Sequence, residues 1–86
     1  MTYKINHGWL HGLVKPHFDS KGYKLLKDDM QFIEKCLSKI PTEAHRDVMV
    51  NYFSIWDAKV PEENSAESRP VNPRYEANTY LRSCCE

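Results

Sequence analysis

The sequence has few cysteines and glycines, no long apolar run and no net charge, and each shortage excludes a class of protein. Three cysteines, two of them adjacent as Cys84 and Cys85, cannot make a disulfide framework, so free thiols in a reducing compartment are expected. The only glycines, Gly8, Gly12 and Gly22, do not form a phosphate-binding loop. No apolar run approaches the roughly 20 residues that cross a bilayer, and the first residues do not resemble a secretory leader. We therefore expect a cytoplasmic protein that does not bind membranes.

The charges balance overall but are unevenly distributed. Twelve basic residues match twelve acidic ones, yet residues 1–27 carry five lysines against a single aspartate, and residues 28–71 carry an excess of acid. An electrostatic grip on DNA or RNA by the whole protein is therefore disfavoured, while a local basic surface at the N-terminal end fits the pattern.

The length and apolar content predict one small helical domain. With 86 residues and 41% hydrophobic side chains, the chain can form a core but has little room for a deep active site. We expect an all-α fold over residues 1–86, a small bundle of three to four short helices with a central antiparallel hairpin. A polar and acidic linker at 61–72 should precede the last helix.

Apolar periodicity and capping residues predict the individual helices. A first helix should span about 6–14, capped by Asn6 and stopped by Pro16. A second, with an apolar stripe of Leu26, Met30, Ile33, Leu37 and Ile40, should follow the capping residues Asp19 and Ser20 and span about 23–39. The third should begin at the cap Thr42 and end at Pro61, forming a hairpin with the second. Asn72 and Pro73 should open a fourth helix that contains Ala77 and Leu81.

Two groups of side chains have the residue types of a metal site or of a catalytic nucleophile but not the accompanying sequence pattern. His7 and His11 lie four residues apart, which suits one zinc ion, and Cys84 or Cys85 could complete the site. No Cys-x-x-Cys or His-Glu-x-x-His pattern accompanies them, so we predict no metal site and no cofactor. Cys36 lies beside the apolar stripe, where a buried thiol is inert, and we predict no catalytic residues and no enzyme activity.

The basic N-terminal stretch is the favoured binding surface. Lysines that can contact phosphate or carboxylate groups alternate here with aromatic rings that can stack on bases. The predicted partner-binding residues are Lys15, Phe18, Lys21, Tyr23, Lys24 and Lys27. The alternative interpretation is an ordinary solvated lysine face.

Two segments support a resemblance to a class of phage proteins. Residues 40–48, followed by Tyr52, and residues 74–82 are similar to small accessory proteins of tailed phages and prophages of enteric bacteria. The resemblance transfers no site residue. It implies a cytoplasmic protein, in the host cytoplasm if phage-encoded, that acts by binding, either assisting phage replication and recombination or blocking a host nuclease or defence complex.

Two functional hypotheses follow. In the first, the chain binds and modulates, as an inhibitor or adaptor, a host or phage protein of DNA metabolism such as a recombination nuclease or a replication factor. In the second, it binds nucleic acid directly through the lysine-rich stretch. A weak contact with nucleic acid is compatible with the first hypothesis. Formation of a homo-oligomer is left open, because short helices with broad apolar faces do not always bury them within one chain.

Overall fold

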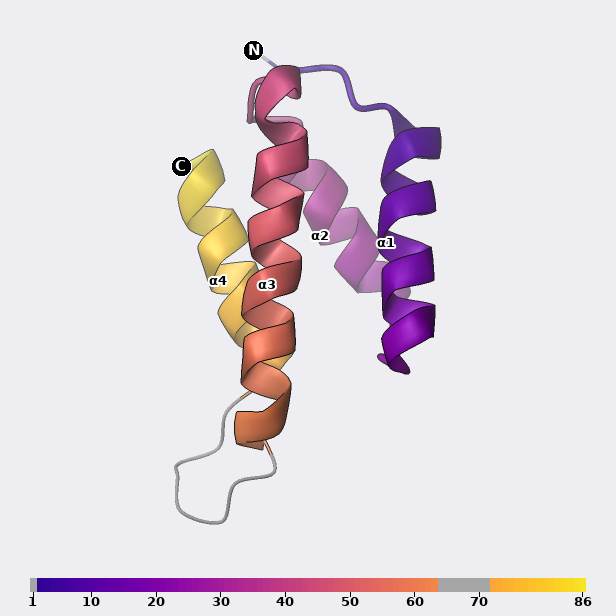
Figure 1. Cartoon of the computed structure of the whole chain (residues 1–86). Coiled ribbons are helices and arrows are strands. Elements are labelled where there is room, and N and C mark those ends of the chain that lie inside the picture. Colours follow the sequence, from indigo (N-terminus) through magenta and orange to yellow (C-terminus); the bar gives the residue numbers. More distant parts are fainter. Residues whose placement is uncertain (1, 64–71) are drawn as a thin grey trace. The chain divides into compact units, whose positions relative to one another are not determined.

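The fold is all-α, as predicted. The structure is a computed structural model that describes residues 2–63 and 72–86. In these ranges it contains α1 (His7–Lys21), α2 (Lys27–Leu37), a 3₁₀ turn at Thr42–Ala44, α3 (His45–Glu63) and α4 (Pro73–Cys85), and no strand (Figure 1). None of these helices is long and apolar enough to cross a membrane. Residues 64–71 of the predicted linker lie outside the described residues.

The chain divides into two compact units, each made from a continuous stretch of sequence. Unit 1 comprises Met1–Thr42, with α1 and α2, and unit 2 comprises Glu43–Glu86, with α3 and α4. The predicted hairpin of the second and third helices would join the two units, and it stays a prediction, as does the single domain over 1–86.

In unit 1, α1 begins where the sequence predicted and ends later. Oδ1 of Asn6 accepts a hydrogen bond from the backbone N–H of Trp9 at 3.0 Å, which confirms the predicted cap. The predicted stop at Pro16 is wrong, because α1 continues to Lys21 and ends at Gly22, whose φ of 74° is the left-handed conformation that glycine adopts readily. The fully buried side chains of Leu10, Val14 and Phe18 recur every four residues on both sides of Pro16. Their burial offsets the one backbone hydrogen bond that proline cannot donate.

The start of α2 also differs from the prediction. The helix begins at Lys27 rather than near Tyr23, and the carboxylate of Asp29 accepts from the backbone N–H of Leu26 at 2.9 Å. Asp19 and Ser20 do not cap it, because both belong to the last turns of α1. Four residues of the predicted stripe are distributed unevenly: Ile33 and Leu37 are fully buried, whereas Met30 is half-buried and Leu26 is 37% exposed.

The irregular N-terminal segment before α1 is hydrogen-bonded to the last residues of unit 1. The backbone N–H of Tyr3 donates to the carbonyl of Ser38 at 2.6 Å, and the hydroxyl of Thr42 donates to the carbonyl of Lys4 at 3.0 Å. Thr42 therefore ties two parts of unit 1 together rather than serving as the predicted helix cap.

In unit 2, α3 and α4 lie side by side and antiparallel (Figure 1). The phenol of Tyr52 donates to Oδ1 of Asn78 at 3.0 Å, and Nδ2 of Asn51 donates to the hydroxyl of Tyr80 at 3.0 Å. Each of these bonds joins α3 to α4, so the pair is held by specific polar contacts as well as by apolar burial.

Both ends of the helix pair bear on the sequence predictions. Asn72 caps α4, accepting from the backbone N–H of Tyr75 at 3.2 Å, and Pro73 takes the first helical position, as predicted. The predicted end of the third helix at Pro61 is wrong by two residues, since α3 reaches Glu63. A proline in the last turn removes a single backbone donor, and that loss does not stop the helix at once.

Candidate functional site

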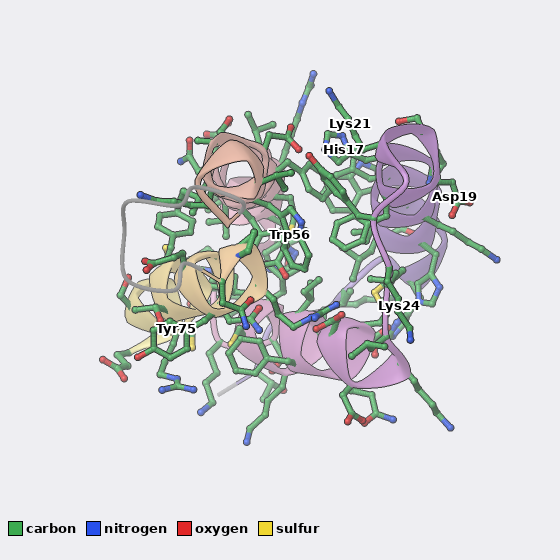
Figure 2. The ribbon with its side chains drawn as sticks, turned by 90° about the horizontal axis from the view of Figure 1, so that it is seen from below. His17, Asp19, Lys21, Lys24, Trp56 and Tyr75 are labelled. Atoms are coloured by element: carbon green, nitrogen blue, oxygen red, sulfur yellow. The ribbon has the colours of Figure 1, made fainter. Side chains whose placement is uncertain are left out.

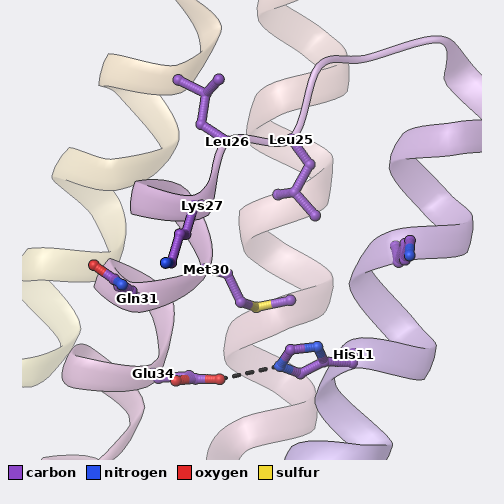
Figure 3. Close-up of a pocket in the computed structure, with 8 residues that line it drawn as sticks. His11, Leu25, Leu26, Lys27, Met30, Gln31 and Glu34 are labelled. Atoms are coloured by element: carbon purple, nitrogen blue, oxygen red, sulfur yellow. Dashed lines mark hydrogen bonds and ion pairs between the residues drawn. The ribbon is translucent and has the colours of Figure 1, made fainter.

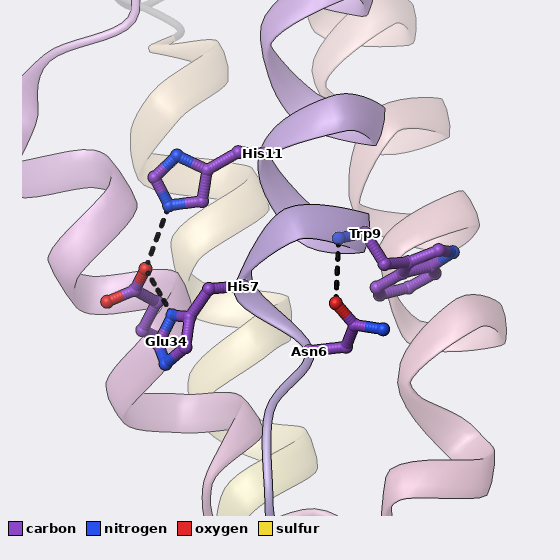
Figure 4. Close-up of polar contacts among 5 residues, drawn as sticks. All are labelled: Asn6, His7, Trp9, His11 and Glu34. Atoms are coloured by element: carbon purple, nitrogen blue, oxygen red, sulfur yellow. Dashed lines mark hydrogen bonds and ion pairs between the residues drawn. The ribbon is translucent and has the colours of Figure 1, made fainter.

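Two histidines of α1 and one glutamate of α2 form a polar cluster in unit 1. Nδ1 of His7 lies 3.2 Å from Oε1 of Glu34, and Nε2 of His11 lies 3.1 Å from the same oxygen (Figure 4). A carboxylate only accepts hydrogen bonds, so each imidazole donates a ring N–H to it. The three ligand-type atoms lie within 4.8 Å of one another. We call this group the His-Glu cluster.

Local sequence explains how the two histidines come to share a face of α1. The Asn6 cap places His7 at the first position of the helix, and His11 follows one turn later. Figure 4 shows both rings directed toward Glu34, with Trp9 leaving α1 on the other side. The side chains of His7 and His11 are 65% and 53% exposed, while that of Glu34 is 27% exposed. Solvent therefore reaches the cluster.

Electrostatics in the cluster favours the ionised carboxylate. Burial raises the pKa of Glu34, but hydrogen bonds from His11 and His7 and the charge interactions with the same two side chains together lower it by more. The net result is a pKa below the ordinary glutamate value. Glu34 is consequently anionic at neutral pH and fit to bind a cation or a protonated ring.

A pocket of about 370 Å³ adjoins the His-Glu cluster in unit 1. It contains apolar side chains, with two lysines and other polar groups also lining it; its lining residues are His11, Lys15, Leu25, Leu26, Lys27, Met30, Gln31 and Glu34. Figure 3 shows Met30 and His11 entering it from α2 and α1. Its volume lies in the range of small-ligand sites, and a large apolar side chain of a partner would also fit.

The structure assigns different environments to the predicted partner-binding residues. Lys15 and Lys27 line the pocket, and Lys21 and Lys24 are exposed. Figure 2 shows Lys21 and Asp19 leaving α1 on different sides, so the one aspartate of this region does not neutralise that lysine. Within residues 2–63 and 72–86, no carboxylate forms an ion pair with Lys15, Lys21 or Lys27.

The two aromatic residues of the predicted surface are less accessible than the lysines. Phe18 is fully buried, and its ring meets that of Tyr23 edge to face, with centroids 5.7 Å apart and planes at 86°. Tyr23 is half-buried. Phe18 thus contributes to the packing of unit 1 and presents no face on which a base could stack.

The sequence pattern indicated some residues of this site and missed others. The spacing of His7 and His11 is visible in the sequence, but Glu34 lies 23 residues beyond His11 and meets it only in the tertiary structure. Leu26 and Met30 belong to the apolar stripe predicted for the second helix, and the structure places both in the lining of the pocket. Cys84 and Cys85, considered as partners of the histidines, belong to α4 of unit 2.

Comparisons with known proteins provide no family assignment. No protein-family model matches the sequence, and neither a curated protein nor a solved structure has significant similarity to it.

Proposed function

We propose that this chain is a binding module that docks on an acidic protein surface through the pocket of unit 1. The observation that supports this proposal is the combination of an apolar pocket with Lys15 and Lys27 in its wall and Lys21 nearby in sequence. An apolar anchor residue of the partner would fill the space beside Leu25 and Met30, while its carboxylates meet the lysines. Such a combination of one buried anchor and surrounding complementary charge is typical of protein interfaces.

The same surface suits a protein better than a nucleic acid. Unstacked bases need exposed rings, and the ring of Phe18 is buried. None of the residues that line the pocket is an arginine, the side chain that binds phosphate through bidentate hydrogen bonds. Direct binding of DNA or RNA through the lysines remains the second candidate, supported by the three lysines that no described carboxylate neutralises.

The resemblance of residues 40–48 and 74–82 to phage accessory proteins supplies the class of partner in this proposal. We infer that the partner is a host or phage protein of DNA metabolism, and that the chain modulates it by occupying a surface rather than by catalysis. The required carboxylates would be present in an acidic groove that normally contacts the basic side chains of a DNA-binding protein. They would also be present on an acidic surface that mimics DNA.

The experiment compares two lysine pairs on the same unit. Lys15→Glu/Lys27→Glu reverses the charges that line the pocket, and Lys35→Glu/Lys39→Glu reverses two exposed lysines of the α2 region that do not line it. Tagged proteins are used to capture partners from bacterial lysate, and the affinity of a captured protein is measured with purified components. The proposal expects binding to the control pair and at least a tenfold loss with the pocket pair, mainly through slower association.

A third variant and a gel-shift assay separate the two candidates. Leu26→Asp places a charge at a 37% exposed position of the pocket and should abolish a protein contact that uses an apolar anchor. If the ligand is duplex DNA, this variant should bind with little change, and the affinity should fall with salt with a log-log slope of about −3 to −4 for four lysine contacts. Equal partner binding by both lysine pairs would contradict the proposal.

A further inference from the structure

In contrast to the sequence-based prediction of no metal site, we propose that His7, His11 and Glu34 form a binding site for a divalent transition-metal ion of the zinc type. This proposal does not rest on the proposed function, because it makes no use of the lysines, although His11 and Glu34 also line the pocket. Its basis is the convergence of three ligand atoms from two helices on one small volume within unit 1.

Two of the three distances in the cluster are close to those of a zinc coordination polyhedron. Zinc bonds of about 2.0–2.1 Å to nitrogen and oxygen place neighbouring ligands of a tetrahedral site about 3.3 Å apart. The two nitrogen-to-oxygen distances to Glu34 are 3.1 and 3.2 Å, so these two edges already have nearly the required length. Both imidazoles are more than half exposed, which leaves the rings room to turn and bring their nitrogens closer together.

The donor set selects among metal ions. Two imidazole nitrogens and one carboxylate oxygen suit zinc and its neighbours in the first transition series, whereas magnesium and calcium prefer oxygen ligands throughout. One carboxylate charge partly neutralises the dication. Three ligands leave at least one coordination position, which water or a side chain of a partner would occupy.

Metal binding would replace a specific pair of hydrogen bonds. In the metal-free cluster the protons lie on Nδ1 of His7 and Nε2 of His11, facing Oε1 of Glu34. The bound ion takes their place: a protonated ring releases the proton that faces Glu34 to solvent and keeps the other, and a neutral ring exchanges its proton through solvent onto the nitrogen that does not bind the metal. The carboxylate of Glu34 then coordinates the metal instead of accepting two N–H groups.

The test is a zinc titration of the full chain. Protein stripped of metal by dialysis against a chelator is titrated with zinc chloride at neutral pH in competition with a chromophoric chelator. We expect one zinc ion per chain. His7→Ala, His11→Ala and Glu34→Gln should each weaken binding at least tenfold, because even loss of a residue that only supports a metal ligand costs about 10- to 100-fold.

Matched controls keep the result specific. His17→Ala removes a histidine of α1 that is outside the cluster and should bind zinc like the parent. Alanine favours the helix more than histidine does, and circular dichroism of each variant will confirm that α1 is intact. Weaker binding in well-folded His7→Ala and unchanged binding in His17→Ala therefore support the site.

Cysteine is the competing ligand, and it is tested separately. Cys84→Ser/Cys85→Ser should retain full zinc affinity, and cobalt substituted for zinc should give ligand-field absorption without a thiolate charge-transfer band. Absence of stoichiometric zinc would overturn the proposal. Binding that survives in His7→Ala and Glu34→Gln but disappears in the double serine variant would also overturn it.

Discussion

The phenol of Tyr52 donates a hydrogen bond of 3.0 Å to Oδ1 of Asn78, and this bond joins the middle of α3 to α4. Tyr52 is fully buried, so its hydroxyl has no water to replace the amide oxygen. Tyr52→Phe keeps the ring and removes the donor, and we expect it to lower the free energy of unfolding by about 1–2 kcal/mol. Urea denaturation measures the change.

A double-mutant cycle identifies the cause of that loss. If the hydrogen bond is responsible, Tyr52→Phe combined with Asn78→Ala should cost less than the sum of the single changes, with a coupling of about 1 kcal/mol. Strict additivity of the two changes would show that the contact does not stabilise unit 2.

Trp56 should be essential to the stability of unit 2. Its side chain is 5% exposed, its ring centroid lies 6.0 Å from that of Tyr52, and the guanidinium of Arg74 lies 5.2 Å from the centroid of the indole. Trp56→Ala should lower the free energy of unfolding by about 3–5 kcal/mol, enough to unfold a small domain. Tyr75, 67% exposed on the outer side of α4, provides the control (Figure 2). Tyr75→Ala should change the free energy by less than about 0.5 kcal/mol, and a similar thermal midpoint for both variants would contradict the assigned packing.

Pro16 tests whether α1 is continuous. Because it lies inside a helix, Pro16→Ala should restore a backbone donor for the carbonyl of Gly12 and raise the free energy of unfolding by about 2 kcal/mol, after allowance for the freer unfolded chain. Gly12→Ala should raise the free energy of unfolding by about 1 kcal/mol, since alanine favours the helix and nothing lies within 4 Å of the new methyl group. Gly22→Ala should instead destabilise, because φ there is 74°. No gain from Pro16→Ala would indicate a helix that ends before this residue.

The hydroxyl of Tyr80 should ionise late. Burial raises its pKa, a hydrogen bond with Cys84 raises it further, and the bond from Asn51 opposes both without cancelling them. A phenol whose pKa is raised in the folded state contributes stability that is complete below its usual value of 10.0 and is lost as the pH rises through the folded value. In a spectrophotometric titration of phenolate, the Tyr80→Phe variant should therefore lack one ionisation step that the parent protein shows above pH 10. Asn51→Ala should move that step to still higher pH, and a downward shift would contradict the assigned roles.

The parts of the fold that were predictable depend on local chemistry. Asn6 and Asn72 were recognised as caps because the side chain bonds to a backbone N–H three residues later, whatever the rest of the fold does. Pro16 misled the prediction because burial elsewhere on α1 compensates for its missing donor. That compensation depends on packing, which the spacing of residues along the chain does not reveal.

The candidate site likewise has parts that local sequence patterns predict and parts that depend on tertiary packing. The one-turn spacing of His7 and His11 and the excess of lysine at the N-terminal end are sequence patterns, and both residue sets recur in the site. Glu34 joins the histidines, and Leu26 and Met30 join the pocket, through the tertiary arrangement of α1 and α2. Periodicity alone could not separate these two apolar residues from the buried Ile33 and Leu37.

The contiguity of unit 1 has a consequence for biosynthesis. Its bonds from Tyr3 to Ser38, from Lys4 to Thr42 and from the two histidines to Glu34 all close within the first 42 residues. A ribosome adds roughly 5–20 residues per second, whereas helices and short loops form in microseconds. Once Thr42 has left the exit tunnel, every partner for these contacts is present, before α3 and α4 emerge.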